Sequence, residues 1–462
     1  MQEAESLTTH QKEVFDSIVD KMTTNLKSFL SYRDIEERLF SLTGAAGTGK
    51  SFLTVQIVSH IAKTISESNC PYDNIWVTAP THKATSILRD ALKLQLNNRK
   101  TQYGTLHSFL KMKLSYDLNT GAEKFIADKF DRKQNRASLL VIDESSMIDA
   151  ELYELVIEAV QMQRVHEVLF IGDPYQLLPV NNGHNKVYQL PLQHQLTEIV
   201  RQKKDSDIIS LSQKIKSCIK EQDFIPLDEI FRDSVDSKEI EFFTDSNAFL
   251  DDFYKEKQWY DKDKTFTSFT NETVDALNDA ARNQFWLEKG VENPNFLAVG
   301  DTVRFKSALN ADGVRSNQHS GSFQTGEEVK IRTVEPKFNN QFGIKYCTCT
   351  VTNKKKRVFH VVDPDSLITF NTALHNLAID AKNAVYPTNR TLWRKYYELK
   401  NSFADIQYSF ASTIHKLQGS TFDTVYIDLS SLIYNSYMDQ NLKYRLVYVA
   451  ITRARSKIKL FY

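Results

Sequence analysis

The chain has 462 residues, enough for two to four domains of roughly 100 to 200 residues each, which excludes a single small binding module. Its hydrophobic content of 41% and charged content of 25% are those of folded globular proteins, so a wholly disordered chain is excluded. The 58 Lys and Arg residues balance the 58 Asp and Glu residues, so any polyanion site must come from a local cluster of cations.

No stretch approaches the roughly 18 consecutive apolar residues of a membrane-spanning helix. The first residues are polar and acidic, unlike a signal peptide. We therefore expect a cytoplasmic protein with no membrane association. The four cysteines are too few and too scattered for a disulfide framework, and we expect them to be reduced, packed thiols; they are Cys70, Cys218, Cys347 and Cys349.

Short apolar segments rich in β-branched residues predict buried parallel strands in the first half of the chain. They lie around residues 39–43, 75–79, 139–142 and 168–171. Segments between them, such as 51–66 and 150–163, have apolar residues at helical spacing. This alternation predicts an α/β domain with a parallel sheet.

A stretch within this domain has a different pattern. Apolar and polar residues alternate through Leu114, Tyr116 and Leu118, and an Asn-Thr-Gly turn follows at 119–121. The alternation and the turn predict a β-hairpin inserted between strands of the sheet.

The second half of the chain repeats the strand and helix patterns. They run over 265–278 and resume over 409–462, which predicts a second α/β domain. The stretch from 296 to about 370 is strand-like and predicts a small inserted β-barrel, and residues 371–401 predict a helical, aromatic-rich piece.

The strongest local motif is the glycine-rich stretch GAAGTGKS, which follows a predicted strand and precedes a predicted helix. Backbone N–H groups of such a loop bind phosphates. We expect Lys50 to reach the β- and γ-phosphates and the Ser51 hydroxyl to hold Mg²⁺. The predicted phosphate-binding residues are Gly44, Ala45, Ala46, Gly47, Thr48, Gly49, Lys50 and Ser51.

Polar residues at two strand ends complete the predicted catalytic site. Asp143 is expected to help hold Mg²⁺ and Glu144 to orient or deprotonate the attacking water. Gln176 follows the next strand at the same sheet edge and is a candidate sensor of the γ-phosphate, with a polar turn residue as the alternative. Arg201 and Arg453 are candidates for neutralising charge at the γ-phosphate, although their spacing alone also fits surface ion pairs.

Taken in order, these motifs resemble those of superfamily 1 helicases, specifically the 5′-to-3′ branch (1B) that includes Dda-like phage helicases, RecD and Pif-type enzymes. The resemblance covers nearly the whole chain. Its motifs are Leu7 to Gln11, Gly44 to Ser51, Thr78 to Ala84, Thr105 to Ser108, Asp143 with Glu144, Gly172 to Val180, the segment of Arg201, Ser268 to Asn271, Ser412 to Asp423 and the segment of Arg453.

The resemblance implies an α/β fold of two RecA-like P-loop NTPase domains, with an inserted β-hairpin (pin) and an inserted SH3-like β-barrel. The expected first RecA-like domain (1A) covers 1–107 and 138–203, and the pin (1B) covers 108–137. The expected second RecA-like domain (2A) covers 204–295 and 402–462, and the barrel with its helical extension (2B) covers 296–401.

The resemblance also implies roles for individual residues. Catalysis is expected from Lys50, Glu144, Gln176, Arg201 and Arg453, and Gln11, Gly419 and Asp423 are expected to join the ATP site. The expected DNA-binding residues are Thr81, His82, Thr105, His107, Phe125, Phe269, Asn271, Thr413, His415 and Lys416. Phe125 is the predicted wedge aromatic of the pin, with Tyr116 and Phe130 as alternatives.

The implied activity is that of an ATP-dependent DNA helicase that translocates 5′ to 3′ on single-stranded DNA and unwinds duplex, with ATP and Mg²⁺, in DNA replication, repair or recombination. We expect a monomer that binds single-stranded DNA and single-strand/duplex junctions, with single-strand-binding or replisome proteins as further candidate partners. If the chain is phage-encoded, its expected place is the host cytoplasm or nucleoid.

Two alternatives stay open. The first is an RNA helicase of the same superfamily, because phosphate and stacking contacts barely distinguish the two sugars. The second is an ATP-dependent nucleic-acid clamp or remodeler without strand separation. A GTPase is disfavoured because the chain has no Asn-Lys-x-Asp guanine motif.

Overall fold

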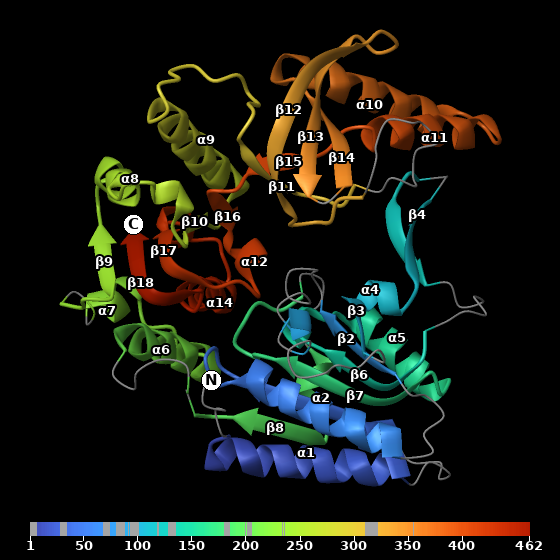
Figure 1. Ribbon diagram of the computed structural model, residues 1–462, viewed down its shortest axis with the longest axis vertical. Helices are drawn as coiled ribbons and strands as arrows, with labels where there is room; N and C mark the ends of the chain where they lie inside the picture. The colour runs from blue at the N-terminus through green and yellow to red at the C-terminus, as the bar shows by residue number, and fades with distance from the viewer. Residues whose placement is uncertain are drawn as a thin grey trace.

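The computed structural model describes residues 7–27, 35–67, 74–79, 88–90, 92, 101–117, 120–127, 135–179, 185–198, 200, 206–232, 234, 236–309, 322–353 and 355–462. Within these residues the chain forms two parallel sheets with helices on both faces, an antiparallel sheet with a helical pair, and a two-stranded hairpin (Figure 1). None of the described helices is both long and apolar enough to cross a membrane.

The first parallel-sheet unit has six strands in the order β3-β2-β6-β7-β1-β8, and all its pairings are parallel. The strands are β1 (Leu39–Gly44), β2 (Ile75–Ala79), β3 (Thr101–Thr105), β6 (Ala137–Ile142), β7 (Val165–Gly172) and β8 (Leu192–Leu196). The predicted strands at 39–43, 75–79, 139–142 and 168–171 are therefore confirmed. Every residue of β1, β2, β6 and β7 is buried, as expected for strands covered on both faces.

Alternate residues of these strands enter two separate cores. One core lies under α1 (Thr9–Lys27) and α2 (Lys50–Glu67). The other lies under α4 (Leu106–Phe109) and α5 (Ala150–Gln161). This two-sided packing leaves the carboxyl edge of the sheet, where β1, β6 and β7 end, as the place for polar residues.

The second parallel-sheet unit has five strands in the order β16-β10-β17-β18-β9, again with all pairings parallel. The strands are β9 (Ile240–Phe243), β10 (Lys264–Ser268), β16 (Ala411–Thr413), β17 (Phe422–Asp428) and β18 (Ala454–Phe461). The core on one face includes residues of α6 (Asp207–Glu221), α7 (Leu227–Arg232), α12 (Ile414–Leu417), α13 (Ser430–Ile433) and α14 (Gln440–Ile451). The core on the other face includes α8 (Ser246–Tyr254) and α9 (Asn271–Leu287).

The antiparallel sheet has the order β14-β13-β12-β11-β15. Its strands are β11 (Thr302–Phe305), β12 (Glu328–Asn339), β13 (Ile344–Asn353), β14 (Lys355–Val362) and β15 (Ile406–Tyr408). The helices α10 (Leu367–Asn383) and α11 (Thr388–Lys400) form an antiparallel pair beside it (Figure 1). Cys347 and Cys349 are buried free thiols of this sheet, and burial raises the pKa of Cys349 to about 12. Short 3₁₀ turns are η1 (Ile35–Arg38), η2 (Ser145–Met147), η3 (Lys186–Gln189), η4 (Trp259–Asp261) and η6 (Pro364–Ser366).

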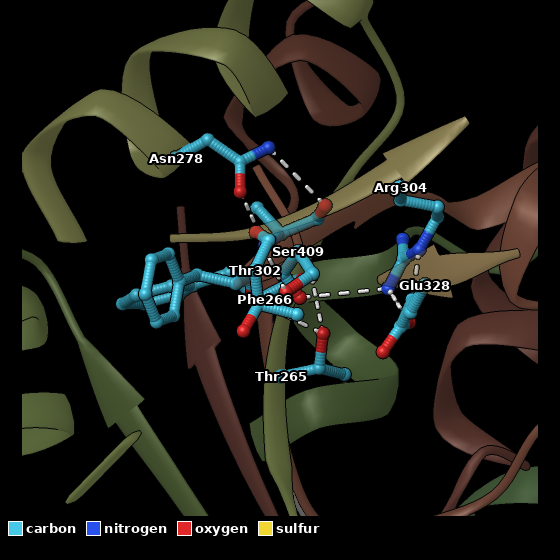
Figure 2. A network of polar contacts seen from close by, with 9 residues as sticks. Thr265, Phe266, Asn278, Thr302, Arg304, Glu328 and Ser409 are labelled. Atoms are coloured by element: carbon cyan, nitrogen blue, oxygen red, sulfur yellow. Dashed lines mark hydrogen bonds and ion pairs between the residues drawn. The ribbon is translucent and has the colours of Figure 1, made fainter. Parts of the chain in front are cut away.

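Figure 2 shows how the antiparallel sheet is joined to the second parallel-sheet unit through the connection between β15 and β16. Arg304 pairs with Glu328 at 2.7 Å and also donates to the Ser409 carbonyl at 3.5 Å. On the other side, the Asn278 side chain of α9 exchanges two hydrogen bonds with the Ala411 backbone, at 2.8 and 3.2 Å. These contacts fix the start of β16, the strand that leads to Thr413 and His415.

The hairpin of β4 (Met112–Tyr116) and β5 (Glu123–Ala127) lies where the sequence predicts one, and its end contacts α11 (Figure 1). The Tyr397 hydroxyl donates to the Gly121 carbonyl at 2.5 Å, and Lys400 pairs with Glu123 at 2.6 Å. Gly121 has a φ of 71°, and a Cβ there would lie 2.1 Å from the Trp393 ring, so this turn requires glycine.

Candidate functional site

The phosphate-loop motif occupies the turn between β1 and α2. Gly47 and Gly49 have φ angles of 82° and 85°, which glycine adopts without steric cost. The loop ends at the N-terminus of α2, where free backbone N–H groups and the helix dipole favour an anion. Lys50 Nζ donates to the carbonyls of Gly44 and Ala45 at 2.6 and 2.9 Å, so its ammonium lies over the loop. This geometry fits the phosphates of a nucleotide.

Gln11 connects the start of α1 to this loop. Gln11 and Thr8 form a capping box: the Gln11 N–H donates to Thr8 Oγ1 at 3.2 Å, and the Thr8 N–H donates to Gln11 Oε1 at 3.1 Å. Gln11 Nε2 donates to the Thr48 carbonyl at 3.1 Å, and a Cβ on Gly49 would lie 2.5 Å from that nitrogen. The structure therefore places Gln11 against the phosphate loop, and its role in the ATP site stays a prediction.

Asp143 and Glu144 lie directly after β6 at the carboxyl edge of the first sheet. Glu144 has a φ of 50°, an uncommon backbone conformation for a residue other than glycine. Burial and the neighbouring Glu144 charge raise the pKa of Asp143 to about 7. Burial also raises the pKa of Glu144, against the opposing effect of the cations Arg453 and Lys50. The loop lysine, the acidic pair and the arginine near the C-terminus therefore lie within electrostatic reach of one another.

The oxygen atoms present suit a magnesium ion. A carboxylate and a hydroxyl are ligands that Mg²⁺ prefers, and it completes its shell with water and substrate phosphates. Ser51 lies next to Lys50 at the start of α2. The positive charge of Lys50 acts to lower the pKa of Asp143, so Ser51 and Asp143 lie in the same site. Among the described residues, no group of three or more His, Cys, Asp or Glu side chains is arranged to hold a metal by itself.

Gln176 is buried in the loop that follows β7. Its Oε1 accepts a hydrogen bond from Gln418 Nε2 of the second parallel-sheet unit at 3.4 Å. Two residues that sequence analysis missed also reach this loop from α14. Arg445 donates to the Gln176 carbonyl at 2.6 Å, and Tyr448 donates to Asp173 at 2.8 Å. Their position in the helix before Arg453 was the available signal, but their partners depend on how the two units pack.

Arg453 is buried directly after α14. It donates to the carbonyls of Val449 and Ser420 at 3.0 and 3.3 Å, which holds it against the turn that contains Gly419. Asp423 lies apart from this turn, exposed near the start of β17, where it accepts a hydrogen bond from Ser456 at 2.6 Å. Within the described part of the chain, no contact joins Asp423 to the phosphate loop.

The candidate nucleic-acid contacts of the first unit lie at α4 and the hairpin. Thr105 caps α4 by accepting the Ser108 N–H at 3.2 Å. The His107 ring lies 5.0 Å from the Phe125 ring, measured between centroids, and partial burial lowers the pKa of His107. Phe125 is 47% exposed on β5, so its ring remains accessible to a base.

The candidate contacts of the second unit lie where β10 and β16 end. Ser268 and Thr413 are register partners, so the segments that follow them leave the sheet side by side. The Phe269 and His415 rings lie 6.1 Å apart, centroid to centroid, and Asn271 begins α9 with an exposed side chain. Lys416 follows His415 as an exposed residue of α12.

Several predicted residues cannot be placed in this arrangement. Thr81, His82 and Arg201 lie outside the described residues, as does Phe130. The side chain of Tyr116 is also outside the description. Their roles stay predictions.

Comparison with known proteins agrees with these motifs. Residues 31–182 match an AAA domain, and residues 408–460 match a UvrD-like helicase C-terminal domain. The ATP-dependent DNA helicase dda of Enterobacteria phage T4 is 25% identical over 449 residues, which cover 90% of this chain and 92% of that protein. The ATP-dependent DNA helicase PIF1 of Emericella nidulans is 25% identical over 466 residues, which cover 90% of this chain and 57% of that protein.

A crystal structure of the Pif1 helicase from Bacteroides in complex with ADP-AlF3 and ssDNA has a similar fold. It aligns with a TM-score of 0.50 and 16% identity, over 99% of this chain and 92% of that one. The two domain matches cover the phosphate loop with Glu144 and the segment with His415 and Arg453, and the dda alignment spans both proteins almost completely. The domain matches and the alignments along most of the chain support a superfamily 1B helicase of the Dda-like and Pif1-like group.

Proposed function

We propose that the protein is an ATP-dependent DNA helicase that moves 5′ to 3′ along single-stranded DNA and separates the duplex ahead of it. The observation that carries this proposal is the packing of the second parallel-sheet unit against the catalytic edge of the first, where Tyr448 contacts Asp173 and Gln418 contacts Gln176. An arginine supplied by a second unit neutralises the charge that develops on the γ-phosphate during transfer to water.

Each residue of this site has a proposed role in ATP hydrolysis. The phosphate loop and Lys50 bind the phosphates, and Glu144 orients the attacking water and accepts its proton, a role that its raised pKa favours. Gln176, Arg453 and Arg201 contact the γ-phosphate, and Gln11 and Gly419 complete the ATP site. Ser51 and Asp143 would hold Mg²⁺, which when bound neutralises charge on the β- and γ-phosphate oxygens.

Movement along DNA follows from the position of this site between two units. If ATP closes the cleft and hydrolysis opens it, the spacing between two strand-binding surfaces changes with each cycle. The first surface comprises Thr81, His82, Thr105 and His107; the second comprises Phe269, Asn271, Thr413, His415 and Lys416. Hydroxyls, amides and lysine suit phosphates, and rings stack on bases of any sequence.

The domains keep the boundaries given by the sequence in this proposal. The parallel-sheet units are RecA-like domains 1A (1–107 and 138–203) and 2A (204–295 and 402–462). The hairpin within 108–137 is the pin, and its exposed Phe125 is the wedge that meets the fork. Strands β11 to β14 of the antiparallel sheet, with α10 and α11, are the SH3-like 2B insertion of 296–401, and the contact of α11 with Gly121 supports the pin. The fifth strand of the sheet, β15, comes from 402–462. We further propose that the protein acts as a monomer on single-strand/duplex junctions.

Unwinding of partial duplexes tests the proposed function. The substrates carry a 5′ or a 3′ single-stranded tail, in DNA and RNA versions, and the assay contains ATP and Mg²⁺. We expect strand separation only from the 5′-tailed DNA and a loss of at least about 100-fold in Lys50→Ala, because that variant lacks a cation at the transition state.

Other results would identify the alternatives. Unwinding of the RNA substrates in preference to DNA would indicate an RNA helicase. ATP hydrolysis stimulated by single strands without separation of any duplex would indicate a clamp or remodeler.

A further inference from the structure

The loop that carries Gln176 is held by an arginine from the opposite unit. Arg445 of α14 donates from one nitrogen, Nη1, to the carbonyls of Pro174 and Gln176, both at 2.6 Å. Its Nε donates to Asn441 Oδ1 on the same helix at 2.5 Å, which fixes the orientation of the guanidinium. One rigid cation therefore binds two carbonyls of a single turn.

Tyr448, one turn further along α14, holds the same loop through Asp173. Its hydroxyl donates to Asp173 Oδ2 at 2.8 Å, and both side chains are buried, with 1% and 0% of their surfaces exposed. Burial and the Asp173 charge raise the pKa of Tyr448 well above its usual value, so the hydroxyl keeps its proton and remains a donor. The Ala46 N–H of the phosphate loop donates to the same hydroxyl at 3.5 Å.

Asp173 transmits this contact to Gln176 because it closes the turn between them. Its Oδ1 accepts the Tyr175 N–H at 3.0 Å, and its carbonyl accepts the Gln176 N–H at 3.2 Å. Gln418 of the second unit adds a contact to Gln176 Oε1 at 3.4 Å. The backbone and the side chain of Gln176 thus both have partners in the second parallel-sheet unit.

We propose that Arg445 and Tyr448 are positioning residues. Through them, the placement of Gln176, and with it the rate of ATP hydrolysis, depends on the packing of α14 against the turn of residues 173–176. The inference rests on the proposed function, in which Gln176 contacts the γ-phosphate. DNA bound across both units would hold α14 packed against this turn. Binding of a single strand could in this way stimulate ATP hydrolysis.

Tyr448→Phe tests the inference because it removes one hydroxyl and keeps the ring. Tyr444→Phe is the matched control: Tyr444 is equally buried one turn earlier on α14, but its hydroxyl donates to the Ile225 carbonyl within the second unit. Arg445→Lys keeps the charge and loses the planar group that binds two carbonyls. For each protein we would measure ATP hydrolysis with and without single-stranded DNA, the KM for ATP, and the thermal unfolding temperature.

We expect Tyr448→Phe and Arg445→Lys to lower the DNA-stimulated kcat about tenfold, the rate equivalent of one hydrogen bond to a charged group. The KM for ATP should stay within about twofold, because the lost contacts act on the transition state rather than on binding. Tyr444→Phe should keep the kcat of the wild-type protein, even if its unfolding temperature falls.

The inference alone would be overturned if single-stranded DNA stimulates ATP hydrolysis by the wild-type protein but the DNA-stimulated kcat is the same in Tyr448→Phe, Arg445→Lys and Tyr444→Phe. A wild-type protein whose ATP hydrolysis does not respond to single-stranded DNA would overturn the proposed function, and the inference with it.

Discussion

His107 and His415 are candidate DNA contacts whose rings are neutral near pH 7. Partial burial lowers the pKa of His107, against the opposing charge of Asp149. Exclusion of water by the surrounding chain lowers the pKa of His415. A neutral imidazole stacks on bases and exchanges hydrogen bonds, but it does not neutralise a phosphate. At the residue scale, charge in the second unit's strand-binding surface therefore comes from Lys416 rather than from His415.

This difference predicts how DNA binding depends on pH. A lowered pKa means that the rings gain a proton only below their ordinary titration range. The affinity for an oligodeoxythymidine, measured by fluorescence anisotropy at constant ionic strength, should therefore change less than about twofold between pH 6.5 and 8.5. A steady gain in affinity as the pH falls from 8 to 6.5, abolished in His415→Gln, would contradict neutral rings.

Sequence alone predicted the residues whose chemistry follows from a local motif. Lys50 and Ser51 are fixed by a loop between a strand and a helix, and Glu144 by its position at a strand end. Arg445 and Tyr448 were missed because their partners, two carbonyls and Asp173, are set by packing between units that are far apart in the chain. No local spacing specifies such a contact.

At the scale of elements, edge strands were the ones that the sequence did not reveal. The interior strands of the first sheet are continuous apolar runs, which predict buried parallel strands. The edge strand β3 (Thr101–Thr105) has the sequence TQYGT, and β8 (Leu192–Leu196) alternates between half-buried and exposed residues before its buried last residue. Each edge strand has a neighbour on one side only and lacks the apolar run that signals burial.

The hairpin carries a prediction that separates unwinding from ATP hydrolysis. Phe125 is exposed on β5 and lies outside the proposed ATP site, so Phe125→Ala should reduce the unwinding rate about tenfold, from the loss of one stacked base. ATP hydrolysis stimulated by single-stranded DNA should stay within about twofold of wild type. Both rates are measured on the same protein preparation with 5′-tailed DNA.

Phe338→Ala provides the control for this experiment. Phe338 is 55% exposed on β12 of the antiparallel sheet, so the substitution removes a similar aromatic surface from a different hairpin. Equal unwinding by Phe125→Ala and Phe338→Ala would contradict the wedge role of Phe125.

At the scale of the whole molecule, the hairpin and the second unit are connected. The hairpin is inserted in the first parallel-sheet unit, but its turn contacts Tyr397 and Trp393 of α11. The antiparallel sheet beside α11 is in turn fixed to the second unit through Arg304, Ser409 and Asn278 (Figure 2). A change in the spacing of the two units therefore reaches the hairpin as well as the strand-binding surfaces.

The proposed mechanism requires ATP hydrolysis to move this chain along one strand in the 5′-to-3′ direction. The most direct measurement is stopped-flow translocation on single-stranded DNA of several lengths, with a fluorophore at either the 5′ or the 3′ end. We predict that the signal from a 3′-end fluorophore appears after a delay and that this delay grows with DNA length. In Lys50→Ala this delayed signal should be lost. A length-dependent delay at the 5′ end instead, or no ATP-dependent arrival at either end, would contradict this mechanism.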